Sequence, residues 1–204
     1  MKWVWIALSA LALAGCVSVF PKEPPSQLYR FGGQFTAAAA QDQGRHFNVL
    51  ALPVDFSADI AGNQILTVSG HQAAYIKNAR WVSGARSLFT AALANAFDAS
   101  GGPARLLSRG EAVQPQYFLA IEVRTFEADY LAGPGSAPTV RMVVHATLSR
   151  PADHTLAGET TLMASVPTGA NRGEAIAAAF DQADTQILTD LVKWVDKTGA
   201  PAAP

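Results

Sequence analysis

Few residues of this sequence combine the type and the spacing that catalysis or metal binding requires. The four histidines lie at unrelated spacings, so they do not form the His-Glu-x-x-His pattern of a zinc enzyme. The sequence also lacks a Gly-x-Ser-x-Gly nucleophile motif and a Gly-x-x-x-x-Gly-Lys-Ser/Thr phosphate-binding loop. We therefore expect a protein that is not an enzyme, with no catalytic residue, no metal site and no cofactor.

One acidic cluster, formed by Glu122, Glu127 and Asp129, has the residue types of a general acid–base pair. Glu122 and Glu127 are separated by an odd number of residues, so on a regular strand they point to opposite faces of the sheet. The sequence therefore argues against a carboxylate pair and predicts an ion pair with Arg124 or Arg141 instead.

The single cysteine, Cys16, is the nucleophile whose sequence context indicates a covalent modification. It follows a positively charged start and a run of apolar or small residues, 3–14. As a helix this run would span about 18 Å, short of the roughly 30 Å core of a bilayer, which is typical of a signal peptide. The run ends in Leu13, Ala14 and Gly15, and this pattern resembles the lipobox of bacterial lipoproteins. Small side chains give the peptidase access to the backbone, and the cysteine thiol accepts a diacylglyceryl group.

The lipobox resemblance implies that residues 1–15 are a lipoprotein signal peptide and that Cys16 is the first residue of the mature protein. Diacylglyceryl and a further chain such as palmitate would then anchor the protein stably, since two acyl signals suffice. Val17 stands where an aspartate would retain a lipoprotein in the inner membrane, which favours the periplasmic face of the outer membrane. The alternative is an ordinary secretory signal in which the cysteine is coincidental.

The remaining chain divides into a tether, one domain and a tail. Prolines in residues 16–27 predict an extended tether, residues 28–198 form a single domain, and residues 199–204 form a flexible tail. The formal net charge of −1 argues against a nucleic-acid partner, because such proteins concentrate Lys and Arg on one face.

The sequence predicts two amphipathic helices, over residues 83–99 and 172–197, because apolar side chains recur at three- and four-residue spacings. Ser83 is the expected N-cap of the first helix, and Gly101 is expected to end it. Asn171 lies three residues before a glutamate, which resembles the capping box of the second helix.

Alternation of apolar and polar residues predicts half-buried strands that expose one face to water or to a partner. Val143 is the one apolar residue among the polar positions of its strand. The expected strands cover residues 47–54, a hairpin of 65–68 and 72–76, and a meander of 117–123, 140–148 and 156–166. The order predicts an α+β fold: one mainly antiparallel sheet with two amphipathic helices packed on one face.

Three segments together resemble the ABC-type transport auxiliary lipoprotein family, which includes the PqiC-like proteins. They are residues 75–81, in which Tyr75 precedes Arg80 and Trp81 before a helix; residues 119–129, which end in Phe-Glu-Ala-Asp; and the end of the last helix, 190–194. The strand at 29–31 adds to the match. Residues 82–84 depart from the family pattern, which has an acidic residue and proline after Arg-Trp.

The resemblance implies a function through partners. Family members look like accessory parts of transporters that contain a permease, an ATPase and a mammalian-cell-entry (MCE) protein and that move phospholipids or other hydrophobic molecules between the two membranes. We expect the exposed sheet face together with Tyr75, Arg80 and Trp81 to contact the partner. Alternatively, Trp81 belongs to the core. Two other functions remain open: a carrier that binds lipid itself, and a structural lipoprotein that assembles an outer-membrane complex.

Overall fold

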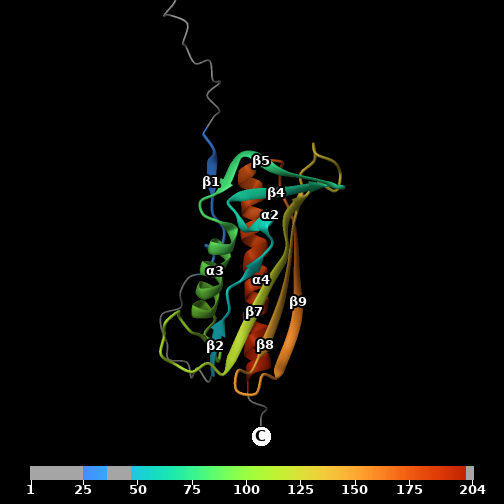
Figure 1. The fold of residues 1–204 in the computed structure, drawn as a ribbon. Coiled ribbons are helices and arrows are strands. Elements are labelled where there is room, and N and C mark those ends of the chain that lie inside the picture. Colours follow the sequence, from blue (N-terminus) through green and yellow to red (C-terminus); the bar gives the residue numbers. More distant parts are fainter. Residues whose placement is uncertain (1–24, 36–46, 201–204) are drawn as a thin grey trace, which may run out of the picture.

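A three-stranded antiparallel meander is the longest part of the sheet in the computed structural model, which describes residues 25–35 and 47–200 (Figure 1). The meander consists of β7 (Tyr117–Asp129), β8 (Thr139–Ser149) and β9 (Leu156–Pro167). Its alternation is confirmed, because every second side chain of β8, from Val140 to Leu148, is buried. The signal peptide, Cys16 and residues 201–204 lie outside the described residues.

Shorter strands pair with the other edge of β7 and extend the sheet to nine strands. Three of them run parallel to β7 at different points along its length: β2 (Phe47–Ala51), β3 (Asp55–Phe56) and β4 (Gln64–Ser69). Three more pair with these or with each other: β6 (Ala104–Leu106) with β2, β5 (Gln72–Trp81) with β4, and β1 (Gln27–Tyr29) with β5. The expected hairpin is β4 and β5.

The α+β fold is confirmed, and the sheet is mixed: its long pairings are antiparallel, as expected, and several short ones are parallel. The parallel pairings with β7 arise because the chain leaves the sheet between β4–β5 and β7 to form a helix, and a parallel neighbour requires such a crossover. Alternation within one strand reports which face is buried, but it does not report which strand lies beside it. The sequence pattern predicted the pairing of β7 with β8 in the meander but left the partners at the other edge of β7 open.

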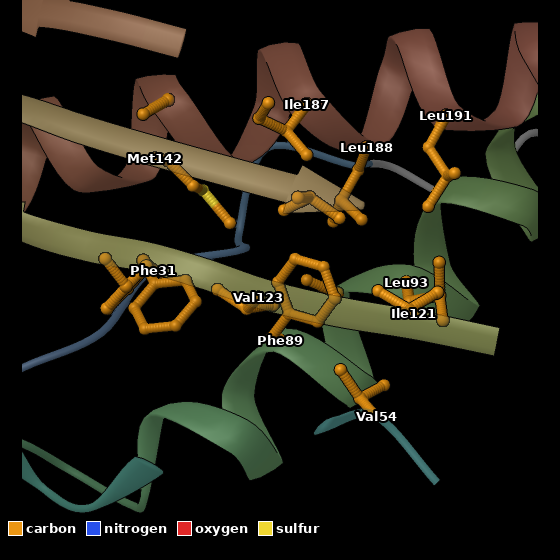
Figure 2. Packing of buried hydrophobic residues seen from close by; sticks show 14 of the residues in the cluster. Phe31, Val54, Phe89, Leu93, Ile121, Val123, Met142, Ile187, Leu188 and Leu191 are labelled. Carbon is orange, nitrogen blue, oxygen red and sulfur yellow. The ribbon is translucent and has the colours of Figure 1, made fainter. Parts of the chain in front are cut away.

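Two long helices, α3 (Ala85–Ser100) and α4 (Gly173–Gly199), supply the other layer. The helix α4 packs along β8 and β9, and α3 packs against α4 and β6. Figure 2 shows Phe89 and Leu93 of α3 and Ile187, Leu188 and Leu191 of α4 converging on the buried side of the strands. A third helix, α2 (Ala58–Ala61), is a single turn between β3 and β4.

None of the helices in the described part of the chain is long and apolar enough to cross a membrane.

The helix ends differ from the expected caps in two places. The N-cap of α3 is Gly84 rather than Ser83, and no side chain caps α4, which begins after Arg172. Asn171 instead accepts a hydrogen bond from the Tyr130 hydroxyl (2.7 Å) and donates to the Pro134 carbonyl (3.1 Å). The capping-box prediction was therefore wrong, because Asn171 holds the β7–β8 loop. The stop at Gly101 is confirmed, with φ at 59°.

Candidate functional site

The face of β7, β8 and β9 that points away from α4 carries the candidate site. We call it the open sheet face, and its central positions are Glu122, Thr125, Glu127, Arg141, Val143, His145, Thr161, Met163 and Ser165. All nine are exposed or half-buried, whereas the alternate positions of the same strands face the core. The meander is therefore amphipathic across its thickness, with one side available to a partner.

Glu122 and Glu127 lie on the same side of the sheet, contrary to the sequence prediction. The register places Glu122 opposite His145 and Glu127 opposite Arg141, with a bulge between Val123 and Thr125. The bulge inserts one unpaired residue into β7 and so cancels the odd spacing of the two glutamates. A regular-strand rule could not detect it.

The predicted ion pairs are present on this face. Arg124 Nε donates to Glu122 Oε2 at 2.8 Å, and Arg141 Nη1 donates to Asp129 Oδ2 at 3.1 Å. Partial burial raises the pKa of Glu127, Arg141 lowers it, and the negative charges of Asp129 and Asp59 raise it further. The two pairs hold their carboxylates in separate contacts, so the geometry does not form an acid–base dyad.

An apolar row crosses the middle of the open sheet face between these charged positions. Thr125, Val143 and Met163 occupy neighbouring strands at the same register. Met163 is 72% exposed. Methionine is among the residue types enriched in the interfaces between proteins, so this exposed side chain is suited to contact a partner. Val143 was noticeable in the sequence as the exception to alternation. Met163 was missed, although it occupies a polar-side position of β9 and the same test would have found it.

Tyr75 and Arg80 face the same side of the sheet although an odd number of residues separates them. Tyr75 pairs with Leu66, and Arg80 pairs with Gln64. Five residue steps along β5 therefore correspond to two along β4, and the additional residues of β5 form a bulge. Within the bulge Asn78 has φ of 58°, a left-handed conformation that asparagine tolerates. The irregularity brings the two predicted contact residues to one surface.

Tyr75 is linked to the open sheet face through α2. Its hydroxyl donates to the Asp59 carbonyl at 3.1 Å, and the Asp59 carboxylate is close enough to raise the pKa of Glu127. The exposed ring of Tyr75 thus borders the end of the open sheet face that carries Glu127 and Arg141. The two surfaces that the sequence predicted separately, the sheet face and Tyr75 with Arg80, are continuous.

Trp81 does not belong to this surface. Its side chain is 1% exposed, and its ring lies 5.0 Å from Phe31 and 5.2 Å from Phe180 in edge-to-face contacts. The prediction that Trp81 contacts a partner was therefore wrong, and the alternative, that Trp81 belongs to the core, is correct. Because side chains alternate along a strand, Arg80 points outward and Trp81 points inward.

The segment after β1 is fastened to α4 by residues that sequence reasoning missed. Oδ1 of Asp181 accepts hydrogen bonds from the backbone N–H of Gly32 at 2.7 Å and of Gly33 at 3.3 Å. Oδ2 accepts one from Gln34 Nε2 at 2.7 Å. A glycine pair after an aromatic residue was visible in the sequence, but its partner lies about 150 residues away, where no local pattern indicates it.

Two grooves along α4 bear on the possibility that the domain carries lipid. One, of about 590 Å³, is lined mainly by polar side chains. The other, of about 290 Å³, lies between α3 and α4 and includes Lys193 and Asp196 among its lining residues. A site for an acyl chain is predominantly apolar. The larger groove does not have that lining, whereas half of the residues that line the smaller one are apolar: Phe35, Ala96, Ala99 and Val192.

The residues described by the structure contain no group of three or more His, Cys, Asp or Glu side chains that could hold a metal ion.

Comparison with known proteins identifies a family. The family model described as "ABC-type transport auxiliary lipoprotein component" matches residues 29–192. No curated protein matches this chain significantly.

Solved structures share the fold. Protein XCC0632 from Xanthomonas campestris has a TM-score of 0.72 at 24% identity, covering 85% of this chain and 96% of its own. An uncharacterized protein has a TM-score of 0.65 at 12% identity, covering 84% and 99%. The hypothetical protein CT253 from Chlamydia trachomatis has a TM-score of 0.51 at 10% identity, covering 75% and 97%.

The family match spans the sheet, the open sheet face and most of α4, and its description names a transport accessory rather than an enzyme. The chain therefore belongs to the family of ABC-type transport auxiliary lipoprotein components.

Proposed function

We propose that this protein is a docking subunit, anchored through acylated Cys16 at the periplasmic face of the outer membrane. Its partner is the MCE protein of a transporter with a permease and an ATPase, and the transported molecules are phospholipids or other hydrophobic compounds. The family match supports the auxiliary role. The partner, the substrate and the membrane are our inference from the resemblance in the sequence.

The observation that carries the docking role is the open sheet face with its exposed apolar row. Met163 and Val143 offer apolar area at the centre, and the paired charges Glu122–Arg124 and Asp129–Arg141 lie on either side. An apolar centre with a polar rim is the arrangement of protein–protein interfaces, in which a few central residues supply most of the binding energy. Tyr75 and Arg80 extend this surface beyond β7 with two residue types common among such hot spots.

The larger groove also agrees better with a docking role than with the carrier alternative. Each methylene exposed to water costs about 0.8 kcal/mol, so a carrier must enclose acyl chains in an apolar cavity. The groove along α4 presents the carboxylates of Asp181 and Asp190 instead. A subunit that passes lipid along a conduit built by its partner needs only the contact surface.

The test is co-purification of the full-length lipoprotein with the MCE partner from crosslinked membranes. The double variant Met163→Asp/Val143→Asp and the double variant Tyr75→Ala/Arg80→Ala are each expected to reduce recovery at least tenfold. Both should leave the midpoint of thermal unfolding nearly unchanged, since these side chains are at least partly exposed. Val113→Asp is the matched control, because Val113 is an exposed apolar residue outside the open sheet face.

Full recovery of the partner with both double variants would contradict this docking surface. Recovery of an outer-membrane assembly without any MCE protein would favour the structural-lipoprotein alternative. Phospholipid that remains bound to the purified domain would favour the carrier. Trp81→Ala serves as the folding control. This variant should recover less of the partner and should also have a lower midpoint of thermal unfolding.

A further inference from the structure

Three segments that are distant in the sequence meet at one end of the domain, the end at which the described chain begins (Figure 1). The last residue of β1 packs on the start of α4, because a Cβ at Gly173 would lie 2.7 Å from the Tyr29 hydroxyl oxygen. Asn171, just before α4, is bonded to Tyr130 and Pro134 of the β7–β8 loop. We call residues 25–28, 130–138 and 169–173 the tether end.

The tether end is poor in charge and presents exposed leucines. Leu131 is 75% exposed at the β7–β8 loop, and Leu28 is 62% exposed on β1. The loop, residues 130–138, contains no charged residue, and Arg172 is the only charged side chain in the three segments. Exposed leucines with cations beside them, Arg172 in the tether end and Arg80 opposite Leu28 on β5, match a bilayer surface, where apolar side chains enter the interface and cations meet the phosphates.

The length of chain before the domain restricts which end can reach a membrane. From Cys16 to residue 25 there are nine residue steps, which span at most about 32 Å when fully extended. The opposite end, where β8 turns into β9, is farther away, because the ten steps of β8 alone rise about 34 Å. A domain held at Cys16 therefore reaches the bilayer more readily with its tether end than with the opposite end.

We propose that the tether end rests on the lipid surface, with Leu131 and Leu28 inserted among the headgroups and Arg172 at the phosphates. The proposal rests on the acylation of Cys16 in the proposed function. It fixes the orientation of the domain: β7, β8 and β9 run toward and away from the bilayer, and the open sheet face is turned sideways into the periplasm. A partner can then approach the open sheet face from the side, and Arg80, which lies beside Leu28, is at the edge of the contact surface next to the membrane.

Site-specific quenching tests this orientation. The acylated full-length protein is reconstituted in vesicles of phosphatidylethanolamine and phosphatidylglycerol whose acyl chains are brominated, and one bimane label is placed at Leu131→Cys. The matched control is Leu156→Cys, because Leu156 is also an exposed leucine (56%) but lies at the opposite end, at the start of β9. Since acylation uses the sulfur of Cys16, the introduced thiol is the only free one.

We expect brominated lipid to quench the label at residue 131 at least twofold more than the label at residue 156. Vesicle flotation that persists without this difference would overturn the orientation and leave the acyl anchor intact. Loss of flotation would overturn the anchor as well. If the label at residue 131 is shielded from aqueous iodide only after the MCE partner is added, the loop contacts protein and the proposal is wrong.

Discussion

Gly32 donates its backbone N–H to Asp181 across 2.7 Å, and this bond ties the segment after β1 to the middle of α4. Immediately before it, Phe31 is buried 5.0 Å from Trp81 and 5.2 Å from Phe126. The segment is thus held by an apolar plug and by a carboxylate that accepts several N–H bonds. Because the anchor is proposed to lie before β1, a pull from the membrane would meet first the pairing of β1 with β5 and then this attachment to the core.

Removing the carboxylate should loosen the segment after β1 without unfolding the domain. Asp181→Ala deletes the acceptor of the Gly32, Gly33 and Gln34 hydrogen bonds, and we expect a loss of about 1–2 kcal/mol in the free energy of unfolding. Urea denaturation measures the loss, and amide hydrogen exchange at Gly32 should accelerate. Asp190→Ala is the control, since Asp190 makes only an exposed 3.8 Å pair with Lys193. An equal effect of both variants would contradict the assigned role of Asp181.

Gly32 should not tolerate a side chain, whereas its neighbour should. At Gly32 φ is +78°, and a Cβ there would lie 2.5 Å from the Cβ of Ala92. Gly32→Ala therefore adds left-handed strain to a steric conflict, and we expect about 2–4 kcal/mol of destabilisation. Gly33→Ala should change the free energy of unfolding by less than about 1 kcal/mol, because nothing lies within 4 Å of its Cβ position.

A second variant separates the two causes at this position. Adding Ala92→Gly to Gly32→Ala removes the steric conflict and leaves the backbone strain. We expect part of the lost stability to return in chemical denaturation. If Gly32→Ala were as stable as Gly33→Ala, the close approach of this segment to α3 would be wrong.

Local patterns predicted the amphipathic elements but not the irregularities that shape the candidate site. The spacing of Phe89 and Leu93 identified α3, and alternation identified β8, because burial of one face repeats with the period of the backbone. Glu122 with Glu127, and Tyr75 with Arg80, were brought together by bulges that break this period. A bulge depends on how a strand pairs with its neighbour, and that information is spread over the whole sheet.

The polar contacts between distant residues were beyond sequence reasoning for the same reason. Nothing near Asp181 indicates that its partner is Gly32, and nothing near Asn171 indicates that it holds the β7–β8 loop rather than capping α4. Such residues have the same local context whether they face water or a folded neighbour.

The charge of Arg141 should control the titration of Glu127 on the open sheet face. Arg141 lowers the pKa of Glu127 against the raising effects of burial and of Asp129 and Asp59. Arg141→Met removes this opposing charge, so the pKa of Glu127 should rise further above the ordinary value of 4.5. Carboxyl-selective NMR titration measures the change. Arg124→Met should have a smaller effect, because Arg124 is bonded to Glu122, and a greater effect there would contradict the register at the bulge.

Asp184 should make the wild-type protein less stable as the pH rises. Its side chain is 0% exposed, and both carboxyl oxygens lack a hydrogen-bond partner within the described residues. Burial raises the pKa of Asp184 well above 3.8, and the nearby Asp181 raises it further. The folded state therefore holds this proton more tightly than the unfolded chain does. Stability is highest below pH 3.8 for this group and falls as the pH rises from there through the raised pKa.

Asp184→Asn removes the titrating group while keeping its size. The free energy of unfolding of the variant relative to wild type should thus increase steadily above pH 3.8 and level off once the wild-type carboxyl is ionised. Urea denaturation of both proteins between pH 3 and pH 8 measures the difference. This range extends from about one pH unit below the pKa of an aspartate in the unfolded chain to about four units above it. Because the other carboxyl groups are common to both proteins, their contributions cancel in the comparison. A difference that is independent of pH would mean that Asp184 titrates as an ordinary exposed carboxyl, which its burial on α4 beneath the Gly32 segment does not allow.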